Sequence, residues 1–427
     1  MSSSNWFLVV STWGALFTFN AFRPRTRWQV LAPSFFAQWV TLEMAPLHLL
    51  WQGVATALFI RAGALDHPAG FIGLAITIVS WIGLGSFVLL SLRSRQVVAH
   101  ATKIAIGEEP DSWKGPHPIQ IAAPLWLRDR KVERIKDIRY APEAGSRHLL
   151  DIIRSKSTTT SEPKPVLLQI HGGAWMIGDK SQQGFPLMSE MAKRGWICVA
   201  INYRLSPKSL LPAHLIDCKL ALAWIREHIA EYGGDPNFVA VTGGSAGGHL
   251  SAMVALTASN PVFQPGFEEA DTRVQACVPI YGVYDFDLMF NAPSPKLQNV
   301  ADRMTKIITG TTIHENPELF AELSPVTHVS SDAPPIFIVH GANDTLAPVE
   351  QAHHLLTLLR ERSDEVVGYV ELPGTSHAFE VFHSLRAHNV VQGIAAFLDS
   401  QYERYLENRD LPPSAQHAGP SNADGPI

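Results

Sequence analysis

Cysteine is scarce in this chain, with three residues in 427, at Cys198, Cys218 and Cys277. Their spacing matches no paired metal-binding motif, and Cys198 and Cys277 lie in apolar, strand-like runs, so we expect buried thiols. The sequence also lacks an HExxH motif, a calcium loop and a phosphate-binding loop that ends in Gly-Lys-Ser/Thr. We therefore expect neither a metal nor a cofactor.

Charged residues are also few, at 17% of the chain, and no long basic run occurs. The net charge is −5 and the pI is about 6.4, so nucleic acid is not an expected partner. Hydrophobic residues make up 46% of the chain and the mean hydropathy is +0.05, which is high for a soluble enzyme. This excess is concentrated in the first hundred residues, which therefore need their own explanation.

Three uncharged stretches lie in that N-terminal region. Residues 70–92 are long enough, as a helix, to cross the hydrocarbon core of a membrane. Residues 44–60 are a second candidate span, although they contain His48 and Gln52. Residues 5–22 are rich in Trp and Phe and fit either a span or an interfacial helix. We predict two spans and a candidate third apolar helix, with the lipid bilayer as a partner.

Basic residues bracket the paired spans. Arg23, Arg25 and Arg27 precede them, whereas Arg93 and Arg95 follow them, and the intervening loop has one arginine and one aspartate. The positive charges follow the first apolar run, which is unlike a signal peptide. The positive-inside rule therefore predicts that both ends of the hairpin, and the catalytic region after it, lie on the cytoplasmic side of the cell membrane.

The rest of the chain alternates strand-like and helix-like patterns. Residues 132–154 read as a hairpin and residues 216–232 as a helix. Further strand-like runs cover residues 165–170, 196–204, 238–244, 274–281, 335–339 and 366–372. Alternation of this kind predicts an α/β fold with a doubly wound, mostly parallel sheet.

Residues 285–324 interrupt the alternation and form a candidate lid. The predicted domains are a membrane region at 1–100, a linker or partial cap at 101–130, the α/β domain at 131–401 and a disordered tail at 402–427.

A candidate nucleophile lies between the strand 238–244 and the helical run that follows it. Residues 243–247 read Gly-x-Ser-x-Gly, which places Ser245 on a sharp strand-to-helix turn. Glycines are needed on either side because a Cβ there would clash with neighbouring backbone. The pattern also occurs by chance, so the interpretation depends on the partners that a serine nucleophile requires.

Those partners are a base and an acid that orients it. Asp344 and His377 each follow one of the last two strands, and such strand ends meet at one edge of a doubly wound sheet. The order Ser245, Asp344, His377 is the one expected for this type of triad. The alternatives are Asp285 and Asp287 for the acid, and His340, His353, His354 and His383 for the base.

Attack on a carbonyl also needs donors for the negative oxygen that forms. Gly172 and Gly173 follow a strand and can bring bare backbone close to a substrate. Ala246 follows the candidate nucleophile and opens a helix, so its N–H points toward the same place. We interpret these three residues as an oxyanion hole, and His171 as a structural hydrogen-bonding residue of the same loop.

The motifs together resemble the α/β-hydrolase superfamily and, within it, the hormone-sensitive-lipase-like esterases. The matching segments are residues 171–175, 202–207, 233–236 and 243–248. With its apolar N-terminus, the whole chain is similar to the membrane-associated Lip carboxylesterases of mycobacteria and related actinobacteria. The resemblance implies ester hydrolysis through an acyl-serine intermediate on the residues named above. Two positions depart from the family pattern: Ala174 replaces a third glycine, and Gly244 replaces an acidic residue.

We therefore expect a membrane-associated serine carboxylesterase or lipase that hydrolyses small acyl esters or lipid-derived esters. A serine amidase, such as an arylformamidase-like enzyme, or a peptidase would use the same triad, and matched ester and amide substrates would separate these functions. A hydrolase scaffold without catalytic activity is a third hypothesis. Such scaffolds usually lack a triad residue, whereas this sequence has all three.

Overall fold

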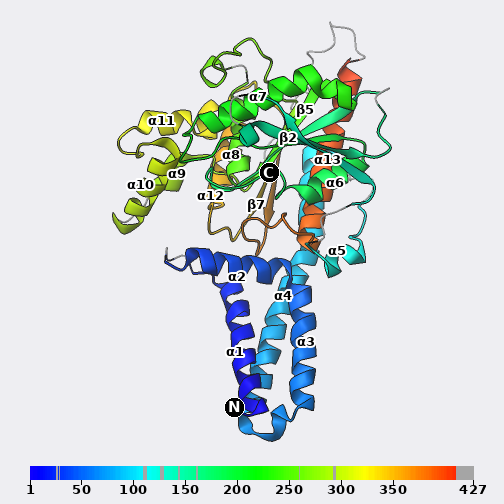
Figure 1. The fold of residues 1–427 in the computed structure, drawn as a ribbon, viewed down its shortest axis with the longest axis vertical. Helices are drawn as coiled ribbons and strands as arrows, with labels where there is room; N and C mark the ends of the chain where they lie inside the picture. The colour runs from blue at the N-terminus through cyan, green and yellow to red at the C-terminus, as the bar shows by residue number, and fades with distance from the viewer. Residues whose placement is uncertain are drawn as a thin grey trace.

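The computed structural model describes residues 1–25, 27, 29–108, 113–125, 129–142, 145–159, 162–258, 260–291 and 295–409. The molecule consists of a narrow helical stalk, which contains the N-terminus, and a larger α/β domain at one end of it (Figure 1). The N-terminal helices are α1 Ser3–Phe22, α2 Leu31–Glu43, α3 Ala45–Arg61 and α4 Pro68–Ile106. Helices α1, α3 and α4 run along the stalk, whereas α2 lies across its end, beneath the α/β domain.

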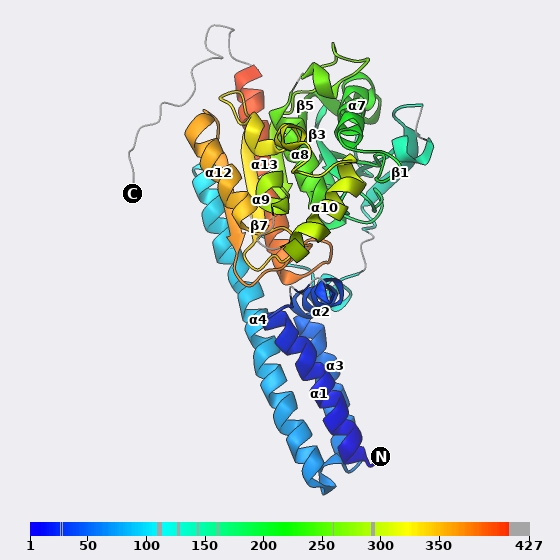
Figure 2. The ribbon, with the colours of Figure 1, turned by 90° about the vertical axis from the view of Figure 1, so that its left-hand side faces the viewer.

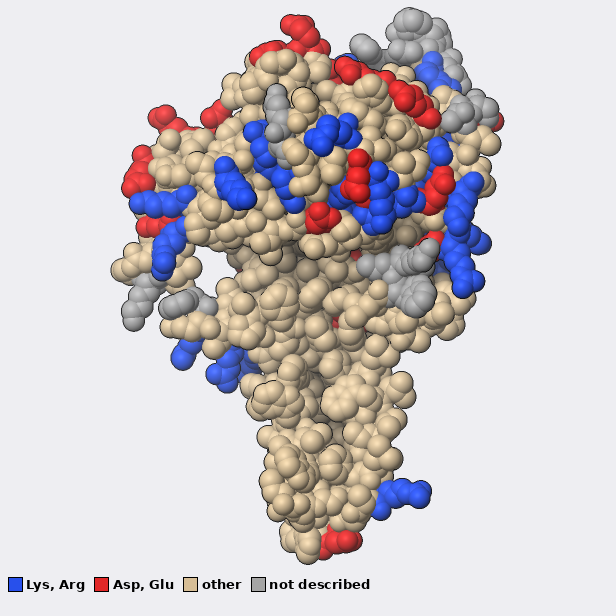
Figure 3. Space-filling model, viewed as in Figure 1, with Lys and Arg blue, Asp and Glu red and all other residues tan. Residues whose placement is uncertain are grey.

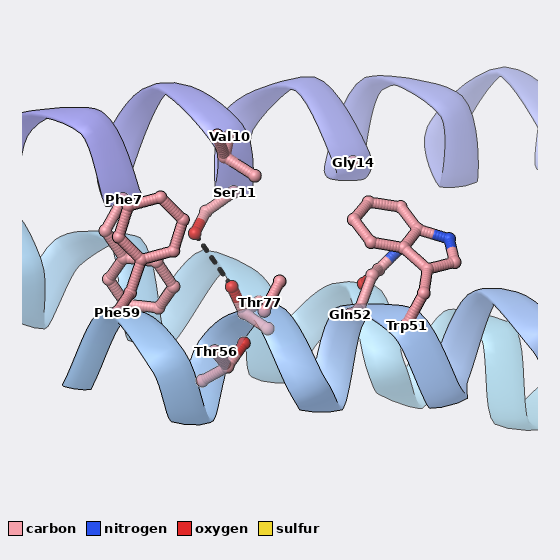
Figure 4. Close-up of a pocket in the computed structure, with 10 residues that line it drawn as sticks. Phe7, Val10, Ser11, Gly14, Trp51, Gln52, Thr56, Phe59 and Thr77 are labelled. Atoms are coloured by element: carbon pink, nitrogen blue, oxygen red, sulfur yellow. Dashed lines mark hydrogen bonds between the residues drawn. The ribbon is translucent and has the colours of Figure 1, made fainter. Parts of the chain in front are cut away.

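The stalk helices pack through small and polar side chains. The hydroxyl of Thr77 on α4 donates to that of Ser11 on α1 across 2.9 Å, and Gly14 lies against the Gln52 side chain of α3 (Figure 4). Two pockets lie between the helices at this level, one of about 20 Å³ that Ser11 and Thr77 line and one of about 240 Å³ that Trp13 and His48 line. Helices that approach through small residues and share polar side chains in this way are typical of bundles in lipid.

Large apolar side chains point outward from the same helices. More than half of the exposed large hydrophobic residues in the described part of the chain lie on α1, α3 and α4. Among the described residues, one helix, α4, is long and apolar enough to cross a membrane by its length and composition. The three stretches predicted as apolar helices are all helical.

The α/β domain is built on one sheet. Within the described residues its strands are β1 Val132–Arg139, β2 Leu149–Ser155, β3 Lys164–Ile170, β4 Ile197–Ile201, β5 Gly234–Gly244, β6 Ala276–Ile280, β7 Ile336–Gly341 and β8 Val367–Leu372. Their order in the sheet is β1-β2-β4-β3-β5-β6-β7-β8. Strand β2 is antiparallel to β1 and β4, and the other pairs are parallel. The predicted hairpin and mostly parallel sheet are thus present, although residues 143 and 144 of the turn lie outside the described residues.

Both faces of the sheet are covered, as the continuous apolar runs of its central strands require. On β3, Val166 and Leu168 enter one hydrophobic core while Leu167 enters the other. The helices of this domain are α5 Pro118–Ala122, α6 Phe185–Lys193, α7 Ala213–His228, α8 Ala246–Leu256, α9 Phe286–Phe290, α10 Pro295–Thr309, α11 Pro317–Glu322, α12 Glu350–Arg362 and α13 Leu385–Arg409.

Two predicted boundaries are wrong. Helix α4 does not end near residue 100 but continues to Ile106, because Val98 and Ala105 are buried in the core of the α/β domain. Residues 101–106 are therefore helix and not linker (Figure 2). At the other end, residues 402–409 continue α13, where Tyr402 and Tyr405 pack on the same core. The rest of the predicted tail, and Trp126 of the predicted linker, lie outside the described residues.

Helix α4 also fixes the direction of the sheet. Ala105, near the end of α4, packs against Gly368 at the start of β8, whereas Leu90, closer to the stalk, packs against Gly374 just beyond the end of β8. Strand β8 therefore points toward the stalk. Because β3, β5, β6 and β7 are parallel to it, all their carboxyl ends face the stalk and α2. Binding sites of doubly wound sheets lie at this edge.

Candidate active site

The turn between β5 and α8 holds Ser245 in a strained conformation. Its φ and ψ angles are 59° and −122°, which non-glycine residues rarely adopt. A Cβ on Gly243 would lie 2.5 Å from the carbonyl oxygen of Ile170, and one on Gly247 would lie 2.1 Å from it. Only glycines allow so close an approach of β3, so the local sequence requires this turn and projects Ser245 from the carboxyl end of β5.

His377 and Asp344 lie together at the same edge. Nδ1 of His377 is 2.6 Å from Oδ2 of Asp344, and the N–H groups of Leu346 and Ala347 donate to Oδ1 at 2.8 and 2.9 Å. Burial alone would raise the pKa of Asp344, but the adjacent His377 and these hydrogen bonds hold it below its usual value. The carboxylate is thus ionised and accepts from Nδ1, which leaves Nε2 available for another partner.

The alternative histidines and acids have other partners. His340 lies 3.6 Å from Asp344, but it is fully buried and its Nε2 is 2.9 Å from the Ala347 carbonyl oxygen. His354 pairs with Asp285 at 2.9 Å and His353 pairs with Glu371 at 2.7 Å. Asp287 lies in the first turn of α9, and the backbone N–H of His383, not its ring, donates to the Pro124 carbonyl oxygen. Of these candidates, the structure brings His377 and Asp344 to the edge at which β5 ends.

Tyr281 connects the two halves of the site, and no sequence motif pointed to it. Its ring lies on that of His377 with centroids 4.5 Å apart, and its hydroxyl donates to the carboxylate of Glu380. A Cβ on Gly244 would lie 2.5 Å from the Tyr281 hydroxyl oxygen. Gly244 therefore makes room for Tyr281 beside Ser245.

The loop after β3 brings the candidate oxyanion donors beside Ser245. A Cβ on Gly172 would lie 3.1 Å from the Cβ of Ser245. The Gly172 N–H donates to the side-chain oxygen of Gln183 at 2.7 Å, so this donor is already paired. Gly173 has a φ of 121°, which glycine adopts without strain, and Ala246 is the first residue of α8. Gln183 was not anticipated from the sequence, because it lies in a polar loop without a recognisable motif.

Three uncharged histidines hold this loop from different sides. His171 lies over the Tyr203 ring and its Nε2 accepts from Arg147 at 3.3 Å. His249 accepts from the indole N–H of Trp175 at 3.1 Å, and His214 lies 3.1 Å from the Trp175 carbonyl. Burial lowers the pKa of all three rings to about 4. His171, the histidine of the loop after β3, therefore serves in packing and hydrogen bonding rather than as a base.

We expect this arrangement to make the α/β domain sensitive to acid. In the unfolded chain these histidines titrate near 6.5, so stability that is present above that pH is lost as the pH falls toward 4. Each ring contributes a loss of about 2 kcal/mol at about pH 5. The thermal midpoint should therefore fall between about pH 7 and pH 5, and His249→Gln should flatten this dependence whereas His228→Gln, at an exposed histidine, should not. A midpoint independent of pH would contradict this expectation.

Comparisons with known proteins agree with the fold and show the family. The BD-FAE family model matches residues 150–359. The chain is 42% identical to the probable carboxylic ester hydrolase LipM of Mycobacterium tuberculosis, over 96% of this chain and 94% of LipM. It is 44% identical to esterase LipQ of the same organism, over 66% of this chain and 65% of LipQ.

Solved structures show the same fold at lower identity. A truncated carbohydrate esterase from gut microbiota superimposes with a TM-score of 0.55 at 24% identity, over 68% of this chain and all of that one. Esterase B from Lactobacillus rhamnosis superimposes with a TM-score of 0.55 at 20% identity, over 66% of this chain and 91% of that one. Together with the match to LipM, which extends over the N-terminal helices, these likenesses show that the chain has an α/β-hydrolase fold and belongs to the Lip family of carboxylic ester hydrolases.

Proposed function

We propose that this protein is a membrane-anchored serine carboxylesterase, with Ser245 as nucleophile, His377 as base and Asp344 as the acid that orients it. The observation that carries the proposal is the 2.6 Å contact between His377 and Asp344 at the strand edge where the strained Ser245 turn also ends. Nucleophile, base and acid then follow three strands of one sheet, which is how this fold assembles such a triad.

In the proposed reaction, Nε2 of His377 takes the proton of the Ser245 hydroxyl as its oxygen attacks the ester carbonyl. The tetrahedral intermediate collapses, and the same histidine gives that proton to the departing alkoxide, which leaves an acyl-serine. Water, deprotonated by His377, attacks the acyl carbonyl, and the acid leaves as Ser245 regains its proton. The Asp344 carboxylate stabilises the imidazolium at both stages.

The oxyanion would be stabilised by the N–H groups of Gly173 and Ala246. The Gly172 N–H donates to Gln183 in this structure, so Gly172 can join the other two donors only when that hydrogen bond opens.

We further propose residues 285–324 as the lid. Their base is fixed by buried Phe286 and Phe320, whereas α10 exposes Leu297, Val300 and Ile307, an apolar surface that suits an acyl chain or a lipid interface.

Hydrolysis of p-nitrophenyl esters with short, medium and long acyl chains by the full-length protein in detergent tests the proposed activity. Rates across the series give the preferred acyl length, and matched p-nitroanilides separate an esterase from an amidase. An absence of hydrolysis throughout, together with no labelling by a fluorophosphonate probe, would contradict the proposal and favour a scaffold without activity.

Membrane anchoring rests on the distribution of charge. The stalk surface shows almost no Lys, Arg, Asp or Glu between its tip and the α/β domain, where charged residues gather (Figure 3). Helix α4 has 39 residues, and its uncharged first part, residues 68–92, would span about 37 Å, enough for a hydrocarbon core of about 30 Å. Arg23 is the C-cap of α1, and Arg93 and Arg95 follow the uncharged part of α4. Helix α1 ends next to α2 and the α/β domain (Figure 1), so these charges support a cytoplasmic position for that domain.

If the stalk is anchored in a bilayer, a charge introduced within the proposed span of α4 should weaken membrane binding. The same charge introduced beyond the span should not. Ile82 and Ile104 are 70% and 65% exposed, but only Ile82 lies within the proposed span. An aspartate near the centre of a span costs about 3 kcal/mol. We expect Ile82→Asp to release the protein from the membrane fraction on alkaline carbonate extraction and Ile104→Asp to leave it there.

Equal behaviour of the two variants, or wild-type protein in the soluble fraction, would rule out a bilayer-embedded stalk. The orientation is tested separately, by adding protease to sealed vesicles. Cleavage of the α/β domain in inside-out vesicles supports the cytoplasmic assignment, and cleavage only in right-side-out vesicles contradicts it.

A further inference from the structure

Helix α2 binds the residues on both sides of His377. The indole N–H of Trp39 donates to the carbonyl oxygen of Ala378 at 2.8 Å. The hydroxyl of Ser376 donates to the side-chain oxygen of Gln38 at 2.9 Å. Two adjacent residues of one N-terminal helix thus bond the side chain of the residue before the proposed catalytic base and the backbone of the residue after it.

Aromatic side chains of α2 add packing at the same place. The ring of Phe35 meets that of His377 edge-on, with centroids 6.3 Å apart and an interplanar angle of 70°. Trp39 stacks on Phe382 at 4.4 Å and 20°. Because Phe35 and His377 are both at least 93% buried, this contact excludes water from one side of the imidazole.

A buried ion pair secures the end of the helix. Glu43, the last residue of α2, pairs with Arg386 and accepts from the Ser384 hydroxyl at 2.6 Å. Glu43 and Arg386 are both buried, so removal of either partner would leave an uncompensated charge. Helix α2 therefore contacts the segment from Ser376 to Arg386 through hydrogen bonds, ring packing and an ion pair.

The α/β domain also contacts the loop that carries His377. The Asn343 N–H donates to the Thr375 carbonyl oxygen at 2.9 Å, and Tyr281 lies against the His377 ring and hydrogen-bonds to Glu380. The loop follows the end of β8 without regular secondary structure, and Ala378 has a φ of 59°, a strained angle for a residue with a side chain. Asp344 holds one nitrogen of the ring but not the backbone on which the ring is carried. A base must be held to within about 0.5 Å for catalysis, so the contacts that fix this backbone matter for rate.

We propose that Gln38 and Trp39 are positioning residues for His377, so that full esterase activity requires α2 to be docked on the α/β domain. This inference rests on the proposed serine esterase function. Since α2 joins α1 to α3, it makes the N-terminal helices part of the catalytic apparatus and not only an anchor.

The test uses the full-length protein in detergent and p-nitrophenyl butyrate, a substrate that needs no membrane. Trp39→Phe removes the N–H donor and keeps an aromatic ring, and Gln38→Leu removes the acceptor. A small displacement of a catalytic group costs up to about 10²-fold, so we expect each variant to lower kcat by on the order of 10-fold or more with KM nearly unchanged. Trp51→Phe is the matched control, because the Trp51 indole donates to His48 within the stalk.

A double-mutant cycle identifies the route of the effect. Ser376→Ala removes the donor on the other side of the same bond, so Gln38→Leu should cause no further loss in a Ser376→Ala background. Additive losses would show that Gln38 does not act through Ser376, and would overturn that half of the proposal. Slow but complete fluorophosphonate labelling of the variants would show that the protein is folded and that the base is misplaced.

The two proposals fail in distinguishable ways. If wild-type protein hydrolyses the ester while Trp39→Phe and Gln38→Leu retain its kcat, α2 has no positioning role and the esterase function stands. If wild-type protein neither hydrolyses the ester nor reacts with the probe, the esterase function itself is wrong. Equal losses in Trp39→Phe and Trp51→Phe would show a general effect of stalk mutations and would also overturn the inference.

Discussion

Ser245→Ala is expected to lower kcat for p-nitrophenyl esters by about 10⁴-fold to 10⁶-fold, the largest effect of any single substitution in this chain. The proposed mechanism forms its covalent bond on the Ser245 oxygen, and no other hydroxyl shares the strained turn at the end of β5. Binding should survive, since the loop of Gly172 and Gly173 is untouched. Steady-state kcat and KM of the full-length protein measure the loss of rate and the retained binding. Fluorophosphonate labelling of the same protein reports whether the reactive hydroxyl is lost.

Ser251→Ala is the matched control for this prediction. Ser251 lies on α8, the helix that Ser245 caps, and its hydroxyl donates to the Gly247 carbonyl at 2.6 Å within that helix. Its loss should leave kcat nearly unchanged. Comparable rates for wild type and Ser245→Ala, or labelling of Ser245→Ala by the probe, would exclude Ser245 as the nucleophile.

Asp344→Asn is expected to cost about 10⁴-fold in kcat, as loss of the orienting carboxylate does in a serine triad. An amide in this place can turn its NH₂ group toward Nδ1 and so favour the tautomer in which Nε2 carries the proton. His377 could then no longer accept the proton of Ser245. Asp344→Asn should lower kcat and kcat/KM by the same factor, because the carboxylate acts in the transition state.

Asp285→Asn tests whether the effect belongs to this pair. Asp285 contacts His354 at 2.9 Å, and that pair is partly exposed, whereas Asp344 is fully buried. It should change kcat little. A large loss in Asp285→Asn with none in Asp344→Asn would reassign the acid to the alternative that the sequence left open.

The residues of the proposed triad were predictable because each sits in a local pattern. Ser245 lies between glycines whose absent Cβ atoms the turn requires, and Asp344 and His377 directly follow strands that their own residues specify. The parallel sheet then brings the strand ends together without further information. Short-range sequence and one topological rule were therefore sufficient.

The supporting residues were not predictable, because their partners are remote in the chain. Gln38 meets Ser376 across 338 positions, and Tyr281 meets Glu380 across 99. Helix α2 itself was missed, since its apolar residues face the loop of another domain and form no span. The limit of the membrane region was misplaced for a related reason. Helix α4 shows one apolar pattern but packs first in the stalk and then on β8, and nothing local marks the change.

The continuity of α4 bears on which esters can be cut. At 39 residues it is about 58 Å long, so it passes through the proposed bilayer and then along the α/β domain without an intervening linker. A flexible tether would let the catalytic domain take many distances and tilts relative to the bilayer. A continuous helix instead fixes the distance between that domain and the bilayer at one value. In the proposed arrangement, the edge that carries Ser245 would face the bilayer from that fixed distance. Selectivity would then follow from how far an ester carbonyl lies from the water interface, before its acyl chain meets the walls of the site.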